Sequence, residues 1–299
     1  MSINCYSSVN EAIKGCFGDN TTIAKSSGTM RGGISSATPL SLSDGRTVIC
    51  KTNSIGKSGF FDAEEEGLNA IARTGTVRTP GLYCKGTDRK AGISFLMMEY
   101  IEPGRDNKET WVRLGHGFAQ MHLADASGFV AGGRYGFPHD NYIGATPQIN
   151  SPKDSWIDFF RECRLLPQIK MASRTLETRD VKGAERILDR LDEYLYEPER
   201  PSLLHGDMWG GNHLVDKNGG PVLIDPAAYV GHHEADLAMT DMFWPMPGQF
   251  YGSYHEMIPE EPGFKDRREI YNLYHWLNHL NLFGSSHLPQ VLRIIRYYS

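Results

Sequence analysis

Residues 203–212 of this chain read LLHGDMWGGN, and residues 222–226 read VLIDP. Asp207 and Asn212 lie in the first segment, and Asp225 follows the apolar run that begins the second. Short apolar runs bounded by Gly and polar residues are typical of buried strands. The sequence therefore predicts that two carboxylates and one amide lie on loops beside strand-like segments.

This combination of side chains is typical of phosphoryl transfer from a metal nucleotide, which needs a carboxylate near the acceptor hydroxyl and oxygen ligands for Mg²⁺. We predict Asp207 to be the catalytic base, and Asn212 and Asp225 to be the Mg²⁺ ligands. Protein kinases have Arg before the catalytic Asp and Phe-Gly after the metal-binding Asp, whereas this chain has Gly206 and Pro226-Ala227. These differences favour a kinase of small molecules over a protein kinase.

The composition is that of an ordinary globular protein with a large core: 299 residues, 40% hydrophobic and 22% charged. The formal net charge of −5 disfavours bulk binding to nucleic acid or to an anionic membrane. No apolar run approaches the ~20 residues of a membrane span, and residues 1–10 are too polar for a signal peptide. We expect a cytoplasmic protein without nucleic-acid or membrane partners, present as a monomer or a weak homo-oligomer.

Strand patterns dominate the first third of the chain, and helical patterns dominate the remainder. We expect a helix within residues 1–20, strands in 21–53, a helix in 60–73, and strands near 81–85 and 93–98. Further helices are expected from residue 110, in 156–171 and 181–196, and after residues 235 and 265. This order predicts an α+β, bilobal protein-kinase-like fold. Residues 1–99 would form the nucleotide-binding lobe, and residues 100–299 a helical lobe with the catalytic loop and acceptor site.

Lys51 ends the apolar strand Thr47–Cys50, as the phosphate-binding lysine of kinases does. Its expected partner is a carboxylate on the helix that follows. We prefer Glu64 and keep Glu66 as the alternative, because the sequence alone does not decide between them.

Two further segments are expected to contact ATP. Gly32 and Gly33 would let backbone N–H groups approach the phosphates, and Ser35, or alternatively Ser36, would donate a hydroxyl. The connection between the lobes would bind adenine through its backbone, at Met98, Glu99, Tyr100 and Ile101.

With these motifs, the chain resembles the fructosamine kinase family (fructosamine/ketosamine-3-kinases), within the aminoglycoside-phosphotransferase-like superfamily. His-Gly-Asp-x-x-x-x-Asn is shared by the whole superfamily. Three features are narrower: Asp140–Gly144, Trp209-x-Gly211-Asn212, and Asp225-Pro226-Ala227 with Gly231. The resemblance implies ATP- and Mg²⁺-dependent phosphorylation of the 3-hydroxyl of free or protein-bound ketosamines, and hence protein deglycation. It places Trp209 on the acceptor side, with a plain packing role as the alternative. We also expect His205 on the acceptor side.

Two alternatives stay open from the sequence. The first is a kinase of the same superfamily that acts on an aminoglycoside, choline or homoserine. The second is a nucleotide-binding regulator without activity, which the intact set of Lys51, Asp207, Asn212 and Asp225 disfavours.

Overall fold

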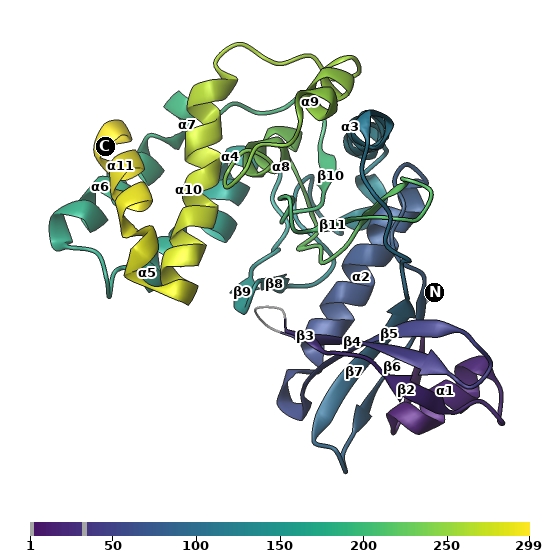
Figure 1. Cartoon of the computed structure of the whole chain (residues 1–299). Helices are drawn as coiled ribbons and strands as arrows, with labels where there is room; N and C mark the ends of the chain where they lie inside the picture. Colours follow the sequence, from purple (N-terminus) through teal and green to yellow (C-terminus); the bar gives the residue numbers. More distant parts are fainter. Residues whose placement is uncertain (1–2, 32–34) are drawn as a thin grey trace.

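The computed structural model describes residues 3–31 and 35–299, in a sheet-rich N-terminal part and a helical C-terminal part (Figure 1). Among the described residues, seven strands form one sheet in the order β1-β6-β7-β5-β4-β2, with β3 paired to β4. The strands are β1 Asn4–Tyr6, β2 Ile23–Ser26, β3 Met30–Arg31, β4 Ser36–Leu42, β5 Thr47–Ser54, β6 Leu82–Asp88 and β7 Ile93–Glu99. Within residues 1–20 we predicted a helix alone. The structure adds β1 before that helix, because β1 pairs in parallel with the distant β6.

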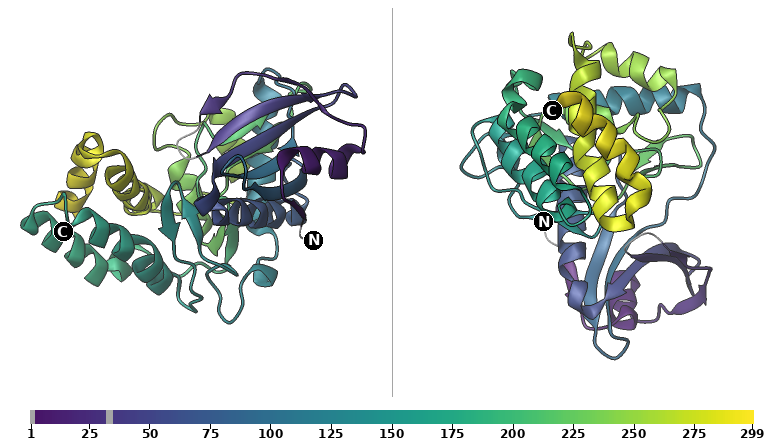
Figure 2. Two further views of the ribbon diagram at one scale, coloured as in Figure 1. Left: turned by 90° about the horizontal axis from the view of Figure 1, so that it is seen from below. Right: turned by 90° about the vertical axis from the view of Figure 1, so that its left-hand side faces the viewer.

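Two helices cover the opposite faces of this sheet: α1 (Val9–Phe17) and α2 (Gly59–Thr74). Successive side chains of a strand point to opposite faces. In β7, Phe95 and Met97 accordingly pack in the apolar cluster that includes α1, whereas Leu96 and Met98 pack in the one that includes α2. Helix α2 thereby lies between the sheet and the C-terminal part, where the two parts meet (Figure 2).

Helices form most of the C-terminal part, as predicted. They are α3 Lys108–Leu123, α4 Trp156–Phe159, α5 Leu166–Ala172, α6 Thr178–Asp189, α7 Leu191–Tyr194, α8 His233–Met239, α9 Gly248–His255, α10 Phe264–Phe283 and α11 Leu288–Tyr298. A π-helical turn joins α4 to α5. The helix predicted over 181–196 is two helices, because Arg190 leaves the helical conformation between α6 and α7. Within the described ranges, no helix has both the length and the apolar character needed to cross a membrane.

Short antiparallel strand pairs carry the loops at the junction of the two parts. They are β8 Asn141–Ile143 with β9 Thr146–Gln148, β10 Ser202–Leu204 with β13 Tyr229–Gly231, and β11 His213–Val215 with β12 Pro221–Leu223. The loop of Asp207 and Asn212 connects β10 to β11, and Asp225 follows β12. The Ile224 N–H donates to the Asn212 carbonyl at 3.0 Å. The two segments singled out by the sequence are therefore neighbours in space.

Candidate active site

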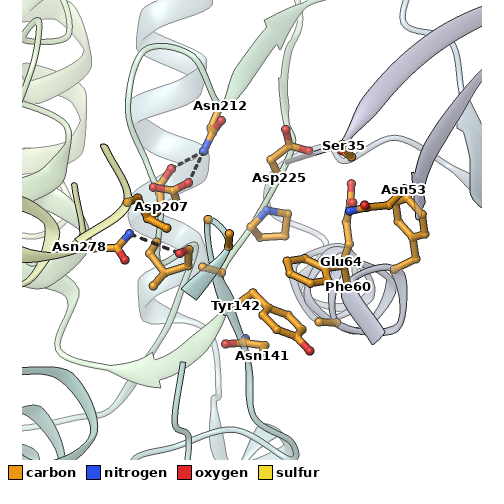
Figure 3. A pocket seen from close by; sticks show the side chains of 18 of the residues that line it. Ser35, Asn53, Phe60, Glu64, Asn141, Tyr142, Asp207, Asn212, Asp225 and Asn278 are labelled. Atoms are coloured by element: carbon orange, nitrogen blue, oxygen red, sulfur yellow. Dashed lines mark hydrogen bonds between the residues drawn. The ribbon is translucent and has the colours of Figure 1, made fainter. Parts of the chain in front are cut away.

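A cavity of about 460 Å³ lies between the two parts (Figure 3). Most of the polar residues that the sequence singled out line it: Ser35, Lys51 and Glu64 from the N-terminal part, and Asp207, Trp209, Asn212 and Asp225 from the C-terminal part. The fold therefore gathers residues from distant segments around one open space.

Lys51, on β5, is held by two carboxylates. Its Nζ lies 2.5 Å from Glu64 Oε1 and also contacts an oxygen of Asp225. Burial disfavours the charged ammonium, but the two carboxylates outweigh this effect and raise the pKa of Lys51. Glu66 lies instead 2.9 Å from the imidazole of His139. Of the two glutamates that the sequence left open, Glu64 is thus the one that contacts Lys51.

The two carboxylates around Lys51 differ in their affinity for a proton. Burial raises the pKa of Glu64 to about 7, although the charge of Lys51 opposes the rise. Burial acts in the same direction on Asp225, but there the charge and hydrogen bond of Lys51 prevail and lower the pKa. Asp225, whose side chain is 45% exposed, therefore offers an ionised carboxylate to the cavity near neutral pH.

The backbone of Asp225 has φ 55, and among the described residues it is the one non-glycine with a positive φ. Residues other than Gly adopt this left-handed conformation at an energetic cost, and such positions cluster at functional sites. The side chain of Asp225 is thus presented by a strained turn at the end of an apolar strand.

Asp207 and Asn212 are bound to each other within the loop. The Nδ2 of Asn212 donates to the Asp207 carbonyl at 2.7 Å and to Asp207 Oδ2 at 2.9 Å (Figure 3). Burial raises the pKa of the Asp207 carboxyl well above its ordinary value, despite the hydrogen bond from Asn212. A raised pKa strengthens a carboxylate as a proton acceptor.

The side chains of Asn212 and Asp225 suit a hard divalent cation. Because its Nδ2 is engaged twice by Asp207, the Oδ1 of Asn212 is turned away from that carboxylate. The amide oxygen and the ionised Asp225 are both ligands that Mg²⁺ accepts, together with phosphate oxygens and water. The donor set therefore fits Mg²⁺ bound with a nucleotide.

A third aspartate, Asp236 in α8, holds the backbone that leads into Asp207. Its Oδ2 accepts the N–H of His205 at 2.6 Å, and its Oδ1 accepts the N–H of Gly206 at 2.8 Å. Behind it, His122 Nε2 lies 3.2 Å from the same carboxylate. The role of Asp236 was not visible in the sequence, because it depends on contacts between separate elements.

Gly206 is required by the shape of this loop. Its φ is +79, and a Cβ at this position would lie 2.1 Å from the carbonyl oxygen of Ala227. No L side chain fits such a space without displacing the backbone. The glycine that stands where protein kinases have Arg is thus explained by the close approach of the segment after Asp225.

The model of the fructosamine kinase family matches residues 5–298. The chain belongs to the fructosamine kinase family. It is 33% identical to the ketosamine-3-kinase of Mus musculus, over 91% of this chain and 94% of that protein. It is 38% identical to the chloroplastic protein-ribulosamine 3-kinase of Arabidopsis thaliana, over 90% of this chain and 81% of that protein. A crystal structure of a Thermobifida fusca protein to which fructosamine-3-kinase activity is attributed superposes with a TM-score of 0.82 at 31% identity, covering 97% of this chain and 98% of that one. The predicted bilobal, kinase-like fold is confirmed.

His205, which we expected on the acceptor side, lies behind the loop of Asp207 and is not among the described residues that line the cavity. Its ring is fully buried. The Nε2–H donates to the Ile224 carbonyl at 2.9 Å, and Nδ1 accepts the Asp207 N–H at 3.3 Å. Burial lowers its pKa, so the ring is neutral. His205 thus joins the loop of Asp207 to the strand end that carries Asp225.

Trp209 does line the cavity, on the side of α10. Its ring packs edge-on against Phe243, with centroids 5.7 Å apart, and Phe243 packs against His279 at 5.1 Å. The His279 Nδ1–H donates to the His275 carbonyl at 2.8 Å, which leaves Nε2 as an acceptor in a residue that also lines the cavity. Burial lowers the pKa of His279 and keeps the ring neutral. No pattern in the sequence had singled out this histidine.

Two other groups of residues were expected to contact the nucleotide. Gly32 and Gly33 fall outside the described residues. Met98, Glu99, Tyr100 and Ile101 lie at the end of β7 and are not among the described residues that line the cavity. The Glu99 carboxylate pairs with Arg78, and the Glu99 N–H donates to the Gly81 carbonyl at 2.7 Å. Their contact with adenine stays a prediction.

Proposed function

We propose that this protein transfers the γ-phosphoryl group of MgATP to the 3-hydroxyl of a ketosamine. The observation that carries the proposal is one cavity in which Lys51, Glu64 and Asp225 face the Asp207–Asn212 pair. Relatives named ketosamine-3-kinase and protein-ribulosamine 3-kinase support the choice of acceptor. In this reading, residues 1–99 are the nucleotide-binding lobe and residues 100–299 the lobe that binds the acceptor.

The N-terminal lobe would hold ATP by charge and by backbone contacts. Lys51, kept in place by Glu64, neutralises the non-reacting phosphates. Ser35 on the cavity wall and the preceding Gly32 and Gly33 would complete the phosphate contacts. The backbone at Met98–Ile101 would bind adenine. Asn212 and Asp225 would hold Mg²⁺, which neutralises the charge that develops on the phosphates during transfer.

Asp207 would orient the acceptor hydroxyl and take up its proton as the phosphoryl group is transferred. The raised pKa of its carboxyl suits this task. On the acceptor side, Trp209 offers a ring face to the sugar, and the neutral His279 Nε2 offers an acceptor to a sugar hydroxyl or to the secondary ammonium of the ketosamine. We further propose that the protein is cytoplasmic and that it is a monomer or a weak homo-oligomer. Its substrates would be free or protein-bound ketosamines.

An acceptor panel tests this function. ADP release from MgATP is measured with fructosyl-lysine, ribulosyl-lysine, an aminoglycoside, choline and homoserine. We expect turnover with the ketosamines alone. Turnover confined to another acceptor would retain the kinase and overturn its substrate, and MgATP binding without turnover of any acceptor would favour a nucleotide-binding regulator.

A further inference from the structure

An aromatic stack joins the two parts of the molecule at the rim of the active site. Phe60 lies in the first turn of α2, and Tyr142 is the central residue of β8. Their ring centroids are 3.8 Å apart and their planes differ by 13°. Both rings line the cavity, and Figure 3 shows them face to face between the helix and the strand.

Tyr142 belongs to a hairpin that is tied to the segment after Asp225. On β8, Asn141 Nδ2 donates to the Ala228 carbonyl at 2.7 Å. On β9, Gln148 Nε2 donates to the Ala227 carbonyl at 3.0 Å and to Asn141 Oδ1 at 2.7 Å. Asn141 and Gln148 are both buried, where such bonds are costly to break. The position of Tyr142 is thus fixed relative to the backbone that carries Asp225.

Phe60 belongs to a helix whose start has little local support. Ser58, the residue before α2, makes no capping hydrogen bond with its side chain among the described residues, and the helix begins with Gly59. Both features weaken the first turn of a helix, because capping bonds are missing and glycine is conformationally free. Glu64 follows Phe60 by one helical turn, so the two side chains lie on the same face of α2.

We propose that Phe60 and Tyr142 are positioning residues for phosphoryl transfer. Their stack fixes the first turns of α2 against the β8–β9 hairpin. Glu64 is thereby held beside Lys51, and Lys51 is held in register with Asp225. This inference rests on the proposed function only in that the site must bind MgATP. The nature of the acceptor does not enter it.

The test measures the affinity for MgATP by calorimetry, without acceptor, in Tyr142→Leu, Phe60→Leu and the double variant. An aromatic pair contributes enough to expect about tenfold weaker MgATP binding in each single variant. The double variant is expected to bind MgATP as tightly as the single variants do, because each single change already removes the stack. Tyr142→Phe keeps the ring and is expected to bind MgATP within about twofold of the wild type. Tyr83→Leu is the matched control, because it removes a ring that packs 4.9 Å from Phe17 on the sheet and not at the cavity.

Unchanged MgATP affinity in Tyr142→Leu would overturn the proposal, as would effects that multiply in the double variant. A loss that Tyr142→Phe shares to the same extent would also contradict it, since that variant retains the stacked ring. Wild-type protein that binds no MgATP would instead overturn the proposed function, and this inference with it. If the wild type binds MgATP but turns over none of the acceptors in the panel, the proposed function fails. The predicted effect of the stack on MgATP binding is then unchanged and is tested by the same variants.

Discussion

Gly206 shows how a single residue determines the geometry of the loop that carries Asp207. With φ +79 and the Ala227 carbonyl oxygen 2.1 Å from an added Cβ, Gly206→Ala must displace the loop that carries Asp207. We expect kcat to fall at least about tenfold and the free energy of unfolding to fall by about 1–3 kcal/mol. Steady-state kinetics and chemical denaturation measure the two effects.

Gly210 supplies the matched control in the same loop. A Cβ at Gly210 would meet no atom within 4 Å, and its φ is not in the left-handed range. Gly210→Ala is therefore expected to keep both kcat and stability close to the wild type. Equal losses in the two variants would show that the loop tolerates no added methyl group, and would remove the special role given to Gly206.

The shifted pKa of the Asp207 carboxyl makes the free energy of unfolding depend on pH. Its folded pKa is raised well above the ordinary value of 3.8, so the ionised form destabilises the folded protein. The proton on Asp207 therefore stabilises the fold fully at low pH, and this contribution is lost as pH rises through the raised pKa.

Asp207→Asn should consequently be more stable than the wild type at neutral pH, with a melting temperature higher by about 2–4 °C. The difference should shrink as pH falls, because the wild-type carboxyl becomes protonated. Thermal unfolding followed across pH measures this effect. A variant less stable than the wild type at neutral pH would assign Asp207 a structural role.

At the scale of elements, helix α2 places the carboxylate of Glu64 beside Lys51 on β5. Glu64→Gln keeps the shape of the side chain but removes the charge that holds Lys51. We expect the KM for MgATP to rise about tenfold, because the charge-assisted hydrogen bond between the Lys51 ammonium and the Glu64 carboxylate is lost.

Glu66→Gln is the control on the same helix, since Glu66 faces His139 and not Lys51. It should leave the KM for MgATP unchanged. A larger effect from Glu66 than from Glu64 would contradict the assignment of the lysine partner.

Some elements could be predicted from local sequence, and others depend on distant partners. The apolar periodicity of α2 and the strand runs of β5 and β7 are local, and the structure confirms them within a few residues. Strand β1 was missed because three residues acquire strand structure only by pairing with β6. The β8–β9 hairpin lies in a stretch with no clear periodicity, and its polar side chains bond to the segment after Asp225.

At the scale of the whole molecule, the order of strand-rich and helix-rich regions predicts the bilobal fold. The spacing of Asp207, Asn212 and Asp225 within one short stretch predicts where the site lies. The contacts that support the site were not predictable, because they join residues far apart in sequence. His122 and Asp236, for example, are separated by 114 positions. No local pattern encodes the stack of Phe60 on Tyr142.

The measurement that tests the central claim most directly is phosphorus NMR of the product formed from fructosyl-lysine and MgATP, by the wild type and by Asp207→Asn, with MgATP affinity measured in parallel. We predict a phosphoester on the 3-hydroxyl with the wild type. With Asp207→Asn we predict no detectable product, although MgATP still binds. Product formed at a comparable rate by Asp207→Asn would contradict the role of Asp207 as the base, and phosphorylation at another hydroxyl would contradict the proposed reaction.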